Sequence, residues 1–193
     1  MQTGSRFLTI NVPNTLTLLR ICLIPVLVVV FYMPFKNHLL VAAGIFGFAA
    51  ATDWVDGYLA RKLGQMTAFG AFLDPVADKL MVAVALVLLV ERHDTQLFTL
   101  AACVIIGREI VVSALREWMA GIGARADVAV GSSGKIKTTL QMFGIAFMVY
   151  EHALFGVDVY VLGYYLLLAA AVMTLWSMFV YLRAAWPTMM KNT

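Results

Sequence analysis

Charged side chains are scarce in this sequence: Asp, Glu, Lys and Arg together make up 13% of its 193 residues. Hydrophobic residues make up 62%, and the mean hydropathy is +0.88. Soluble domains are closer to half apolar, so this composition excludes an ordinary soluble domain and predicts an integral membrane protein. In such a protein the formal net charge of +3 indicates membrane orientation and attraction to anionic lipid, not nucleic-acid binding.

Cysteine is nearly absent. Cys22 and Cys103 lie in separate apolar runs, without a partner motif for a disulfide or a metal site. We therefore expect both to be small packing residues of the core. Long linkers, internal repeats and low-complexity segments are also missing, which predicts a single membrane domain over residues 1–193.

Long hydrophobic runs, by contrast, are abundant. Six of them have approximately the length needed to cross a hydrocarbon core of about 30 Å, which predicts an all-α bundle of six transmembrane helices. The expected spans are Thr15–Met33, Leu39–Ala60, Ala71–Val90, Leu97–Leu115, Thr138–Tyr150 and Val159–Leu182. The fifth run is short, and we expect its helix to begin earlier. The mixed segment Gln2–Asn11 is expected to lie at the membrane surface.

The basic residues orient these spans. If the N-terminus is cytoplasmic, Lys36 and Arg92 are the Lys and Arg residues of the outer loops, and the other twelve of the 14 fall on the cytoplasmic side or in the cytoplasmic halves of helices. The positive-inside rule therefore predicts that both termini are cytoplasmic.

Four of the eleven acidic residues gather in one stretch between two apolar runs, which reads D-x2-D-G-x2-A-R-x8-G-x3-D-x3-D. Its fixed positions are Asp53, Asp56, Gly57, Ala60, Arg61, Gly70, Asp74 and Asp78. At about 100° per helical residue, the first acids share one face of a helix and the last acids share one face of the next. A loop around Arg61–Phe69 would let the two acidic faces converge.

Four carboxylates in an apolar setting must neutralise, pair or bind a cation. Without His or Cys, the site favours a hard divalent cation, Mg²⁺ or Mn²⁺, and four carboxylates suffice for two ions. The alternative is a set of structural ion pairs between helices. Arg61 and Lys79 are too few for that, and ion pairs would not require Gly57 and Gly70, which leave room for a bulky ligand.

Polar residues also recur in the first apolar run, where Asn14, Thr17 and Arg20 follow one another at intervals of three. An arginine this far into an apolar run needs an acidic or phosphate partner, unless it snorkels to the membrane surface.

A second basic set lies later in the chain. Arg108 and Arg116 are spaced eight apart on one helical face, and Lys135 and Lys137 follow a loop at 131–134 that can offer backbone N–H groups to an anion. This set is either a phosphate pocket or a positive-inside patch. The two lysines point to different faces of an ideal helix, so one of them can serve topology alone.

The acidic pattern resembles the signature of the CDP-alcohol phosphotransferases, integral membrane enzymes that move a phosphatidyl or related group from a CDP-linked donor to an alcohol. The resemblance implies two divalent ions on the four aspartates, with Asp78 as the base for the acceptor hydroxyl. It also implies a homodimer in the inner membrane, and the charge pattern described above places the four aspartates, and so the active site, at the cytoplasmic side. The residues that it implies around the nucleotide are Asn14, Thr17, Arg20, Gly57, Ala60, Arg61 and Gly70.

Three further segments, at 108–118, 134–142 and 174–178, look like those of the bacterial phosphatidylglycerophosphate synthases within that family. This narrower resemblance implies CDP-diacylglycerol as donor and glycerol 3-phosphate as acceptor. It places Arg108, Arg116, Lys135 and Lys137 at the phosphate of the acceptor. A sibling enzyme with another acceptor (inositol phosphate, serine or phosphatidylglycerol) and a Mg²⁺ transport protein stay open as alternatives.

Overall fold

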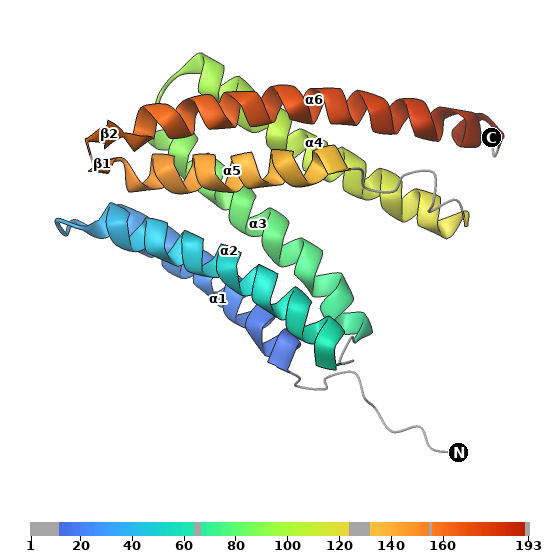
Figure 1. Ribbon diagram of the computed structural model, residues 1–193, viewed down its shortest axis with the longest axis horizontal. Helices are drawn as coiled ribbons and strands as arrows, with labels where there is room; N and C mark the ends of the chain where they lie inside the picture. Colours follow the sequence, from blue (N-terminus) through green and yellow to red (C-terminus); the bar gives the residue numbers. More distant parts are fainter. Residues whose placement is uncertain (1–11, 64–66, 124–131, 155, 192–193) are drawn as a thin grey trace. The chain divides into compact units, whose positions relative to one another are not determined.

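The computed structural model describes residues 12–63, 67–123, 132–154 and 156–191 (Figure 1). Within these ranges the chain forms six helices and one short hairpin, so the all-α prediction is confirmed. The surface segment expected at Gln2–Asn11 lies outside the described residues.

Each predicted apolar run is a helix, and most helices extend beyond the run. Their bounds are α1 (Val12–Tyr32), α2 (His38–Leu63), α3 (Ala68–Arg92), α4 (Gln96–Gly121), α5 (Ser132–Tyr150) and α6 (Val159–Lys191). As expected, α5 begins before Thr138, and its first turn takes up part of the loop expected at 131–134. The bounds expected for the loop around Arg61–Phe69 are wrong at both ends, since α2 continues to Leu63 and α3 begins at Ala68. Backbone hydrogen bonds can continue a helix into polar sequence.

Among the described residues, three helical segments are long and apolar enough to cross a membrane: Asn14–Tyr32, Gln96–Gly121 and Val159–Met190. The apolar part of α2, His38–Asp53, is shorter. The count of six spans therefore stays a prediction.

The strands β1 (Ala153–Leu154) and β2 (Val157–Asp158) form an antiparallel hairpin that the sequence did not predict. Gly156, in the turn, has φ +80°, a conformation open to glycine at little cost. Strands of two residues are too short to show the alternation by which a strand is recognised.

By its contacts the chain divides into two compact units, Met1–Leu88 with Val149–Glu151 and Leu89–Met148 with His152–Thr193. We describe each unit by itself, and the single domain over residues 1–193 stays a prediction.

In the first unit, α1 and α2 pack side by side (Figure 1). Both helices bury apolar residues at intervals of three and four, the spacing that keeps side chains on one helical face. The buried set is Ile24, Leu27 and Phe31 from α1, and Leu39, Ala42, Phe46 and Ala49 from α2. Because this apolar face packs α1 against α2, it sets the rotation of α1 and so the direction of its polar residues Asn14, Thr17 and Arg20.

In the second unit, α4 packs along α6, and α5 approaches α6 at two glycines. A Cβ atom at Gly163 would lie 2.8 Å from the carbonyl oxygen of Gly144 and 2.9 Å from Cβ of Phe147. Leu115 and Met119 of α4 and Ala185 of α6 form a buried apolar cluster. Small residues at such crossings let helix backbones approach closely, as in other membrane bundles.

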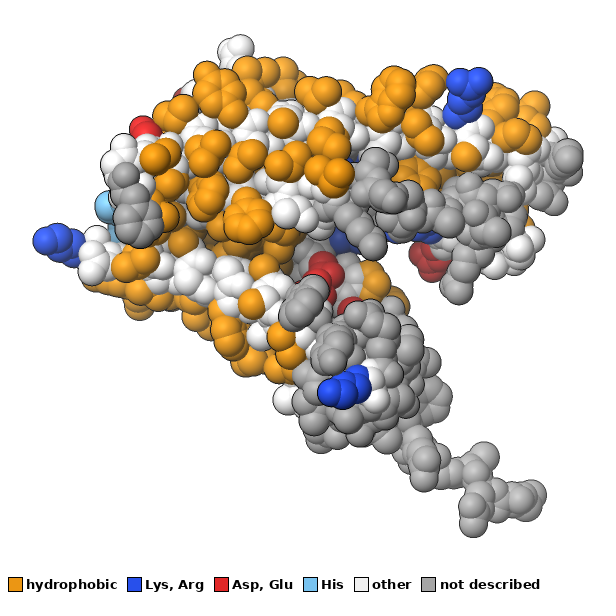
Figure 2. All heavy atoms as spheres, in the orientation of Figure 1, with side chains coloured by type: hydrophobic (Ala, Val, Ile, Leu, Met, Phe, Trp, Pro, Cys, Tyr) orange, Lys and Arg blue, Asp and Glu red, His pale blue; other side chains and the backbone are white. Residues whose placement is uncertain are grey.

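The outer face of α6 is mostly apolar, interrupted by a basic side chain toward its C-terminal end (Figure 2), and Trp176 and Trp186 are among its exposed residues. Cys22 and Cys103 are also exposed, and neither forms a disulfide. The expectation that both cysteines are core residues is therefore wrong. On a membrane helix an apolar residue can face lipid as readily as protein, so hydrophobicity alone does not place it in the core.

Candidate functional site

In the first unit, Arg20 of α1 joins aspartates of two other helices. Its Nη1 donates to Oδ1 of Asp53 in α2 at 3.0 Å and also to Oδ1 of Asp78 in α3. The Arg20 side chain is 1% exposed, whereas the side chains of Asp53 and Asp78 are 44% and 43% exposed. The expected acidic partner is therefore present, and a snorkelling arginine is excluded. The predicted convergence of the two acidic helices is confirmed for these two residues.

One turn earlier on α1, Thr17 donates its hydroxyl hydrogen bond to Oδ1 of Asp74. Thr17 is buried, and it lies three residues from Arg20 on the same side of α1. Thr17 and Arg20 of α1 therefore donate hydrogen bonds to three of the four predicted metal-binding acids, Asp53, Asp74 and Asp78.

Asn14 occupies the space that Gly70 leaves free. A Cβ atom at Gly70 would collide with Oδ1 of Asn14 and lie 3.1 Å from Oγ1 of Thr67. Thr67 links the two, because its hydroxyl donates to Oδ1 of Asn14 at 3.0 Å and accepts the Gly70 N–H at 3.0 Å. Thr67 was not predicted from the sequence. The missing side chain at Gly70 therefore serves the packing of α1 against the start of α3.

The other motif residues of α2 lie within the helix, but their side chains lie outside the described residues: Asp56, Gly57, Ala60 and Arg61. Without Asp56, the described His, Cys, Asp and Glu residues form no group of three that would hold a metal ion by itself.

The charges of the described network nevertheless fit a divalent cation. Arg20 brings one positive charge to two carboxylates, and the described partner of Asp74 is the neutral hydroxyl of Thr17. The donors are all oxygen atoms, and Asp53 and Asp78 keep open surface. Surplus negative charge on oxygen ligands is the environment that hard divalent cations take.

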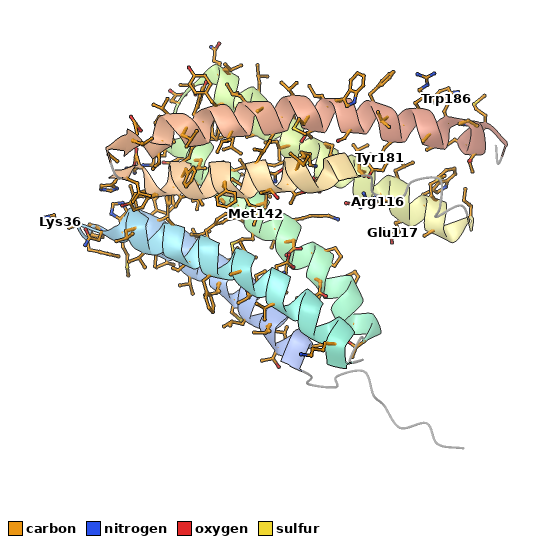
Figure 3. The ribbon with its side chains drawn as sticks, viewed as in Figure 1. Lys36, Arg116, Glu117, Met142, Tyr181 and Trp186 are labelled. Carbon is orange, nitrogen blue, oxygen red and sulfur yellow. The ribbon has the colours of Figure 1, made fainter. Side chains whose placement is uncertain are left out.

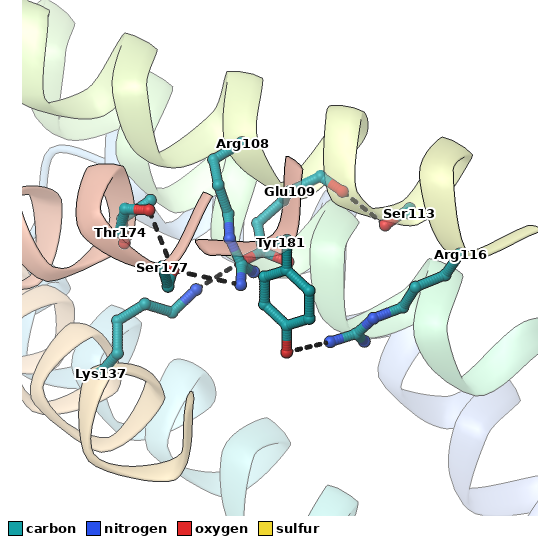
Figure 4. Close-up of polar contacts among 8 residues, drawn as sticks. All are labelled: Arg108, Glu109, Ser113, Arg116, Lys137, Thr174, Ser177 and Tyr181. Carbon is teal, nitrogen blue, oxygen red and sulfur yellow. Dashed lines mark hydrogen bonds and ion pairs between the residues drawn. The ribbon is translucent and has the colours of Figure 1, made fainter. Parts of the chain in front are cut away.

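A basic cluster lies in the second unit (Figure 4). Arg108 of α4 donates from Nη1 to Oε1 of Glu109 at 2.8 Å, and Lys137 of α5 donates from Nζ to the same oxygen at 2.9 Å. Arg108 and Lys137 are both buried. Glu109 therefore holds two of the predicted acceptor-binding cations, from different helices, on one carboxylate oxygen. The side chain of Lys135 lies outside the described residues.

Helix α6 contributes two residues that the sequence reasoning missed. Ser177 accepts a hydrogen bond from Nη2 of Arg108 at 3.4 Å, and the hydroxyl of Tyr181 accepts one from Nη2 of Arg116 at 3.0 Å. Thr174, Ser177 and Tyr181 recur at intervals of three and four in an otherwise apolar helix. That spacing is the signal that could have identified them as one polar face.

The described residues of the basic cluster carry more positive than negative charge. Its described members are three cations and the carboxylate of Glu109. The buried Nε atoms of Arg108 and Arg116 have no acceptor among the described residues. Buried N–H groups rarely lack an acceptor, so the cluster is suited to bind an anion with several oxygen atoms.

The chain is similar to one protein family and to several named relatives. The profile of the CDP-alcohol phosphatidyltransferase family matches residues 10–179, a range that contains the acidic network and, apart from Tyr181, the basic cluster. A Pseudomonas fluorescens protein named CDP-diacylglycerol–glycerol-3-phosphate 3-phosphatidyltransferase is 56% identical over 178 residues, covering 92% of this chain and 91% of the relative. Proteins of the same name from Yersinia enterocolitica and Salmonella choleraesuis are 51% and 53% identical, over 94% and 91% of this chain and 98% and 94% of theirs.

Proposed function

The chain belongs to the CDP-alcohol phosphatidyltransferase family, and from this premise we propose that it transfers the phosphatidyl group of CDP-diacylglycerol to glycerol 3-phosphate. The products would be phosphatidylglycerophosphate and CMP. The observation that carries this proposal is the identity of 51–56%, over more than nine-tenths of each chain, to relatives named for that reaction. Two clusters of opposite charge, one acidic and one basic, are consistent with it.

We assign the donor half of the reaction to the acidic network. Asp53, Asp56, Asp74 and Asp78 would hold two divalent ions, Mg²⁺ or Mn²⁺, which when bound offset negative charge on the diphosphate and on the departing CMP. Arg20 and Thr17 would orient three of these carboxylates, since they already donate hydrogen bonds to them. The remaining residues that we assign to the nucleotide are Asn14, Gly57, Ala60, Arg61 and Gly70.

We assign the acceptor half to the basic cluster. Arg108, Arg116, Lys135 and Lys137 would bind the phosphate of glycerol 3-phosphate, and bidentate arginine contacts suit that group. The surplus of positive charge among the described members supports this role, as do the two Nε atoms without an acceptor.

The chemical step needs no covalent intermediate. The primary hydroxyl of glycerol 3-phosphate would attack the phosphatidyl phosphorus, the bond from that phosphorus to the CMP oxygen would break, and CMP would leave with the electron pair. Asp78 would take the proton of the hydroxyl on a carboxylate oxygen. Alignment of the hydroxyl with the phosphorus would supply much of the acceleration.

The chain is a membrane protein of a membrane-enzyme family, and we propose the finer arrangement from the charge pattern and the resemblance. It would be a multi-pass protein of the inner membrane with both termini and the active site at the cytoplasmic side. The diacylglycerol chains would stay in lipid between helices, and the functional unit would be a homodimer.

An acceptor screen tests the proposal directly. Purified protein, CDP-diacylglycerol and Mg²⁺ would be incubated with each candidate alcohol in turn, and CMP would be measured. We expect CMP with glycerol 3-phosphate. CMP release with serine, inositol phosphate or phosphatidylglycerol instead would assign a different acceptor. Mg²⁺ flux through reconstituted vesicles without CMP release would point to a transport protein.

The role of Asp78 is tested by Asp78→Asn, which keeps the shape of the side chain but not its basicity. We expect turnover to fall at least about 100-fold, the range for loss of a general base, with the protein folded and donor binding measurable. Asp94→Asn, at an exposed residue between α3 and α4, is the control and should keep full activity. A near-normal rate for Asp78→Asn would remove Asp78 as the base.

A further inference from the structure

Tyr181 of α6 stands between the two arginines of the basic cluster. The guanidinium carbon of Arg108 lies 5.6 Å from the centre of the Tyr181 ring, and that of Arg116 lies 5.2 Å from it. The hydroxyl of the same tyrosine accepts the hydrogen bond from Arg116 at 3.0 Å. Arg116 and Tyr181 lie next to each other in Figure 3, and Figure 4 shows the ring between the two guanidinium groups.

Two guanidinium groups held near one ring repel each other, so their arrangement requires a compensating attraction. The electron-rich face of an aromatic ring supplies part of it, because it attracts cations within about 6 Å. Both arginines come from α4, eight residues apart, and the tyrosine reaches them from another helix. One ring from α6 is therefore in contact with both cations of α4.

The unused hydrogen-bond donors indicate what completes the arrangement. Nε of Arg108 and Nε of Arg116 are buried and have no acceptor in the described part of the chain. The whole Arg108 residue is 7% exposed, so its unpaired Nε lies inside the cluster and not at the protein surface. Since the Tyr181 oxygen accepts from Arg116, the phenolic hydrogen can be donated elsewhere. N–H and O–H donors of this kind bind the oxygen atoms of a phosphate monoester.

We propose that Tyr181 is a binding residue of the acceptor site. Its hydroxyl donates a hydrogen bond to the acceptor's phosphate, and its ring holds Arg108 and Arg116 at the spacing that the phosphate bridges. The inference rests on the proposed function for the identity of the acceptor. It also gives the site a means of selection, because an alcohol without a phosphate leaves the Nε donors of both arginines without an acceptor.

Two variants of Tyr181 separate the hydroxyl from the ring. Tyr181→Phe keeps the ring and loses the donor, so KM for glycerol 3-phosphate should rise about 10-fold, as expected for one hydrogen bond to a charged group. Tyr181→Leu loses both and should raise it about 100-fold. In each variant KM for CDP-diacylglycerol should stay within about twofold of the original value, a split that general destabilisation would not produce.

The matched control is Tyr165→Phe, at a tyrosine that is 64% exposed on the same helix. It should leave both KM values unchanged. An unchanged KM for glycerol 3-phosphate in Tyr181→Phe, or an equal rise for both substrates, overturns the proposal. Tyr181→Phe keeps the test valid even if Tyr181→Leu does not fold.

A binding measurement separates this proposal from the proposed function. Inorganic phosphate, titrated into the purified protein by calorimetry, probes the anion site without turnover. We expect Tyr181→Phe to weaken phosphate binding about 10-fold relative to the original protein and to Tyr165→Phe. If the original protein releases no CMP with glycerol 3-phosphate but Tyr181→Phe still weakens phosphate binding, the proposed acceptor is refuted and the role of Tyr181 stands. Equal phosphate binding in all three proteins would refute the role of Tyr181.

Discussion

Replacing Glu109 by glutamine tests how the basic cluster is held together. Glutamine keeps the shape of the side chain and an acceptor oxygen but removes the negative charge. Oε1 of Glu109 accepts from Arg108 at 2.8 Å and from Lys137 at 2.9 Å, and both cations are buried. The substitution therefore weakens two charge-assisted bonds at once and leaves the buried cations without a carboxylate.

The size of the effect follows from these contacts. Loss of the ionic part of a hydrogen bond costs about 1 kcal/mol, so two bonds cost about 2 kcal/mol before solvent screening. The Glu109 side chain is 25% exposed, so some of its charge is screened by water. We expect a loss of about 1–2 kcal/mol in the free energy of unfolding, which lowers Tm by about 2–8 °C in a chain of this size.

The assay is thermal unfolding of the purified protein in detergent, followed by fluorescence, with KM for glycerol 3-phosphate measured in parallel. KM should rise, because Arg108 and Lys137 are no longer held together. The control is Glu117→Gln on the same helix, since Glu117 follows Arg116 as Glu109 follows Arg108, but is exposed (Figure 3). If both variants unfold at the same temperature and keep the same KM, the carboxylate of Glu109 does not organise the cluster.

Two substitutions of glycine test the close approaches of helices. Gly70→Ala should destabilise the protein by about 1–3 kcal/mol, because the new methyl group would collide with Asn14, whereas Gly107→Ala in the open middle of α4 should be neutral or slightly stabilising. Equal unfolding temperatures for these two variants would contradict the packing of α1 against α3. Gly163→Ala should cost a similar amount, because its methyl group would meet the Gly144 carbonyl oxygen and Cβ of Phe147. Chemical denaturation of each variant measures these losses, and an unchanged midpoint for Gly163→Ala would rule out the tight crossing of α5 and α6.

The helices were predictable because their main signal is local. Each apolar run is a helix, since a chain crossing lipid must satisfy its own backbone hydrogen bonds. The ends were less predictable: α6 continues to Lys191, well past the expected end at Leu182. Hydropathy marks the apolar part of a helix, whereas the helix itself can continue into polar residues.

The acidic site was predicted in part. The spacing of three and four residues indicates which acids share a helical face. It does not indicate that Arg20 would form ion pairs with both Asp53 and Asp78, because those contacts depend on how α1 is rotated relative to α2 and α3. The same holds for Gly70: its contact with Asn14 was not predicted, and its role in leaving space for a ligand stays a prediction.

The basic cluster was also predicted only in part. Arg108 and Lys137 were predicted as members of a second basic set, in which one of the two lysines could serve topology alone. The partners of Arg108 are Glu109, one residue away in sequence, and Ser177, on another helix. Tyr181 was missed because only its spacing from Thr174 and Ser177 marks it, and an aromatic residue in an apolar helix otherwise resembles a packing residue.

By itself, the sequence determined the membrane class, the positions of the helices and the spacing of the acidic and basic residues along them. These depend on composition and on the period of one helix, which are local properties. Only the tertiary structure decided which cation meets which carboxylate and which ring separates the two arginines. Such contacts depend on the rotation and approach of neighbouring helices, and these are set by packing at positions such as Gly70, Gly144 and Gly163.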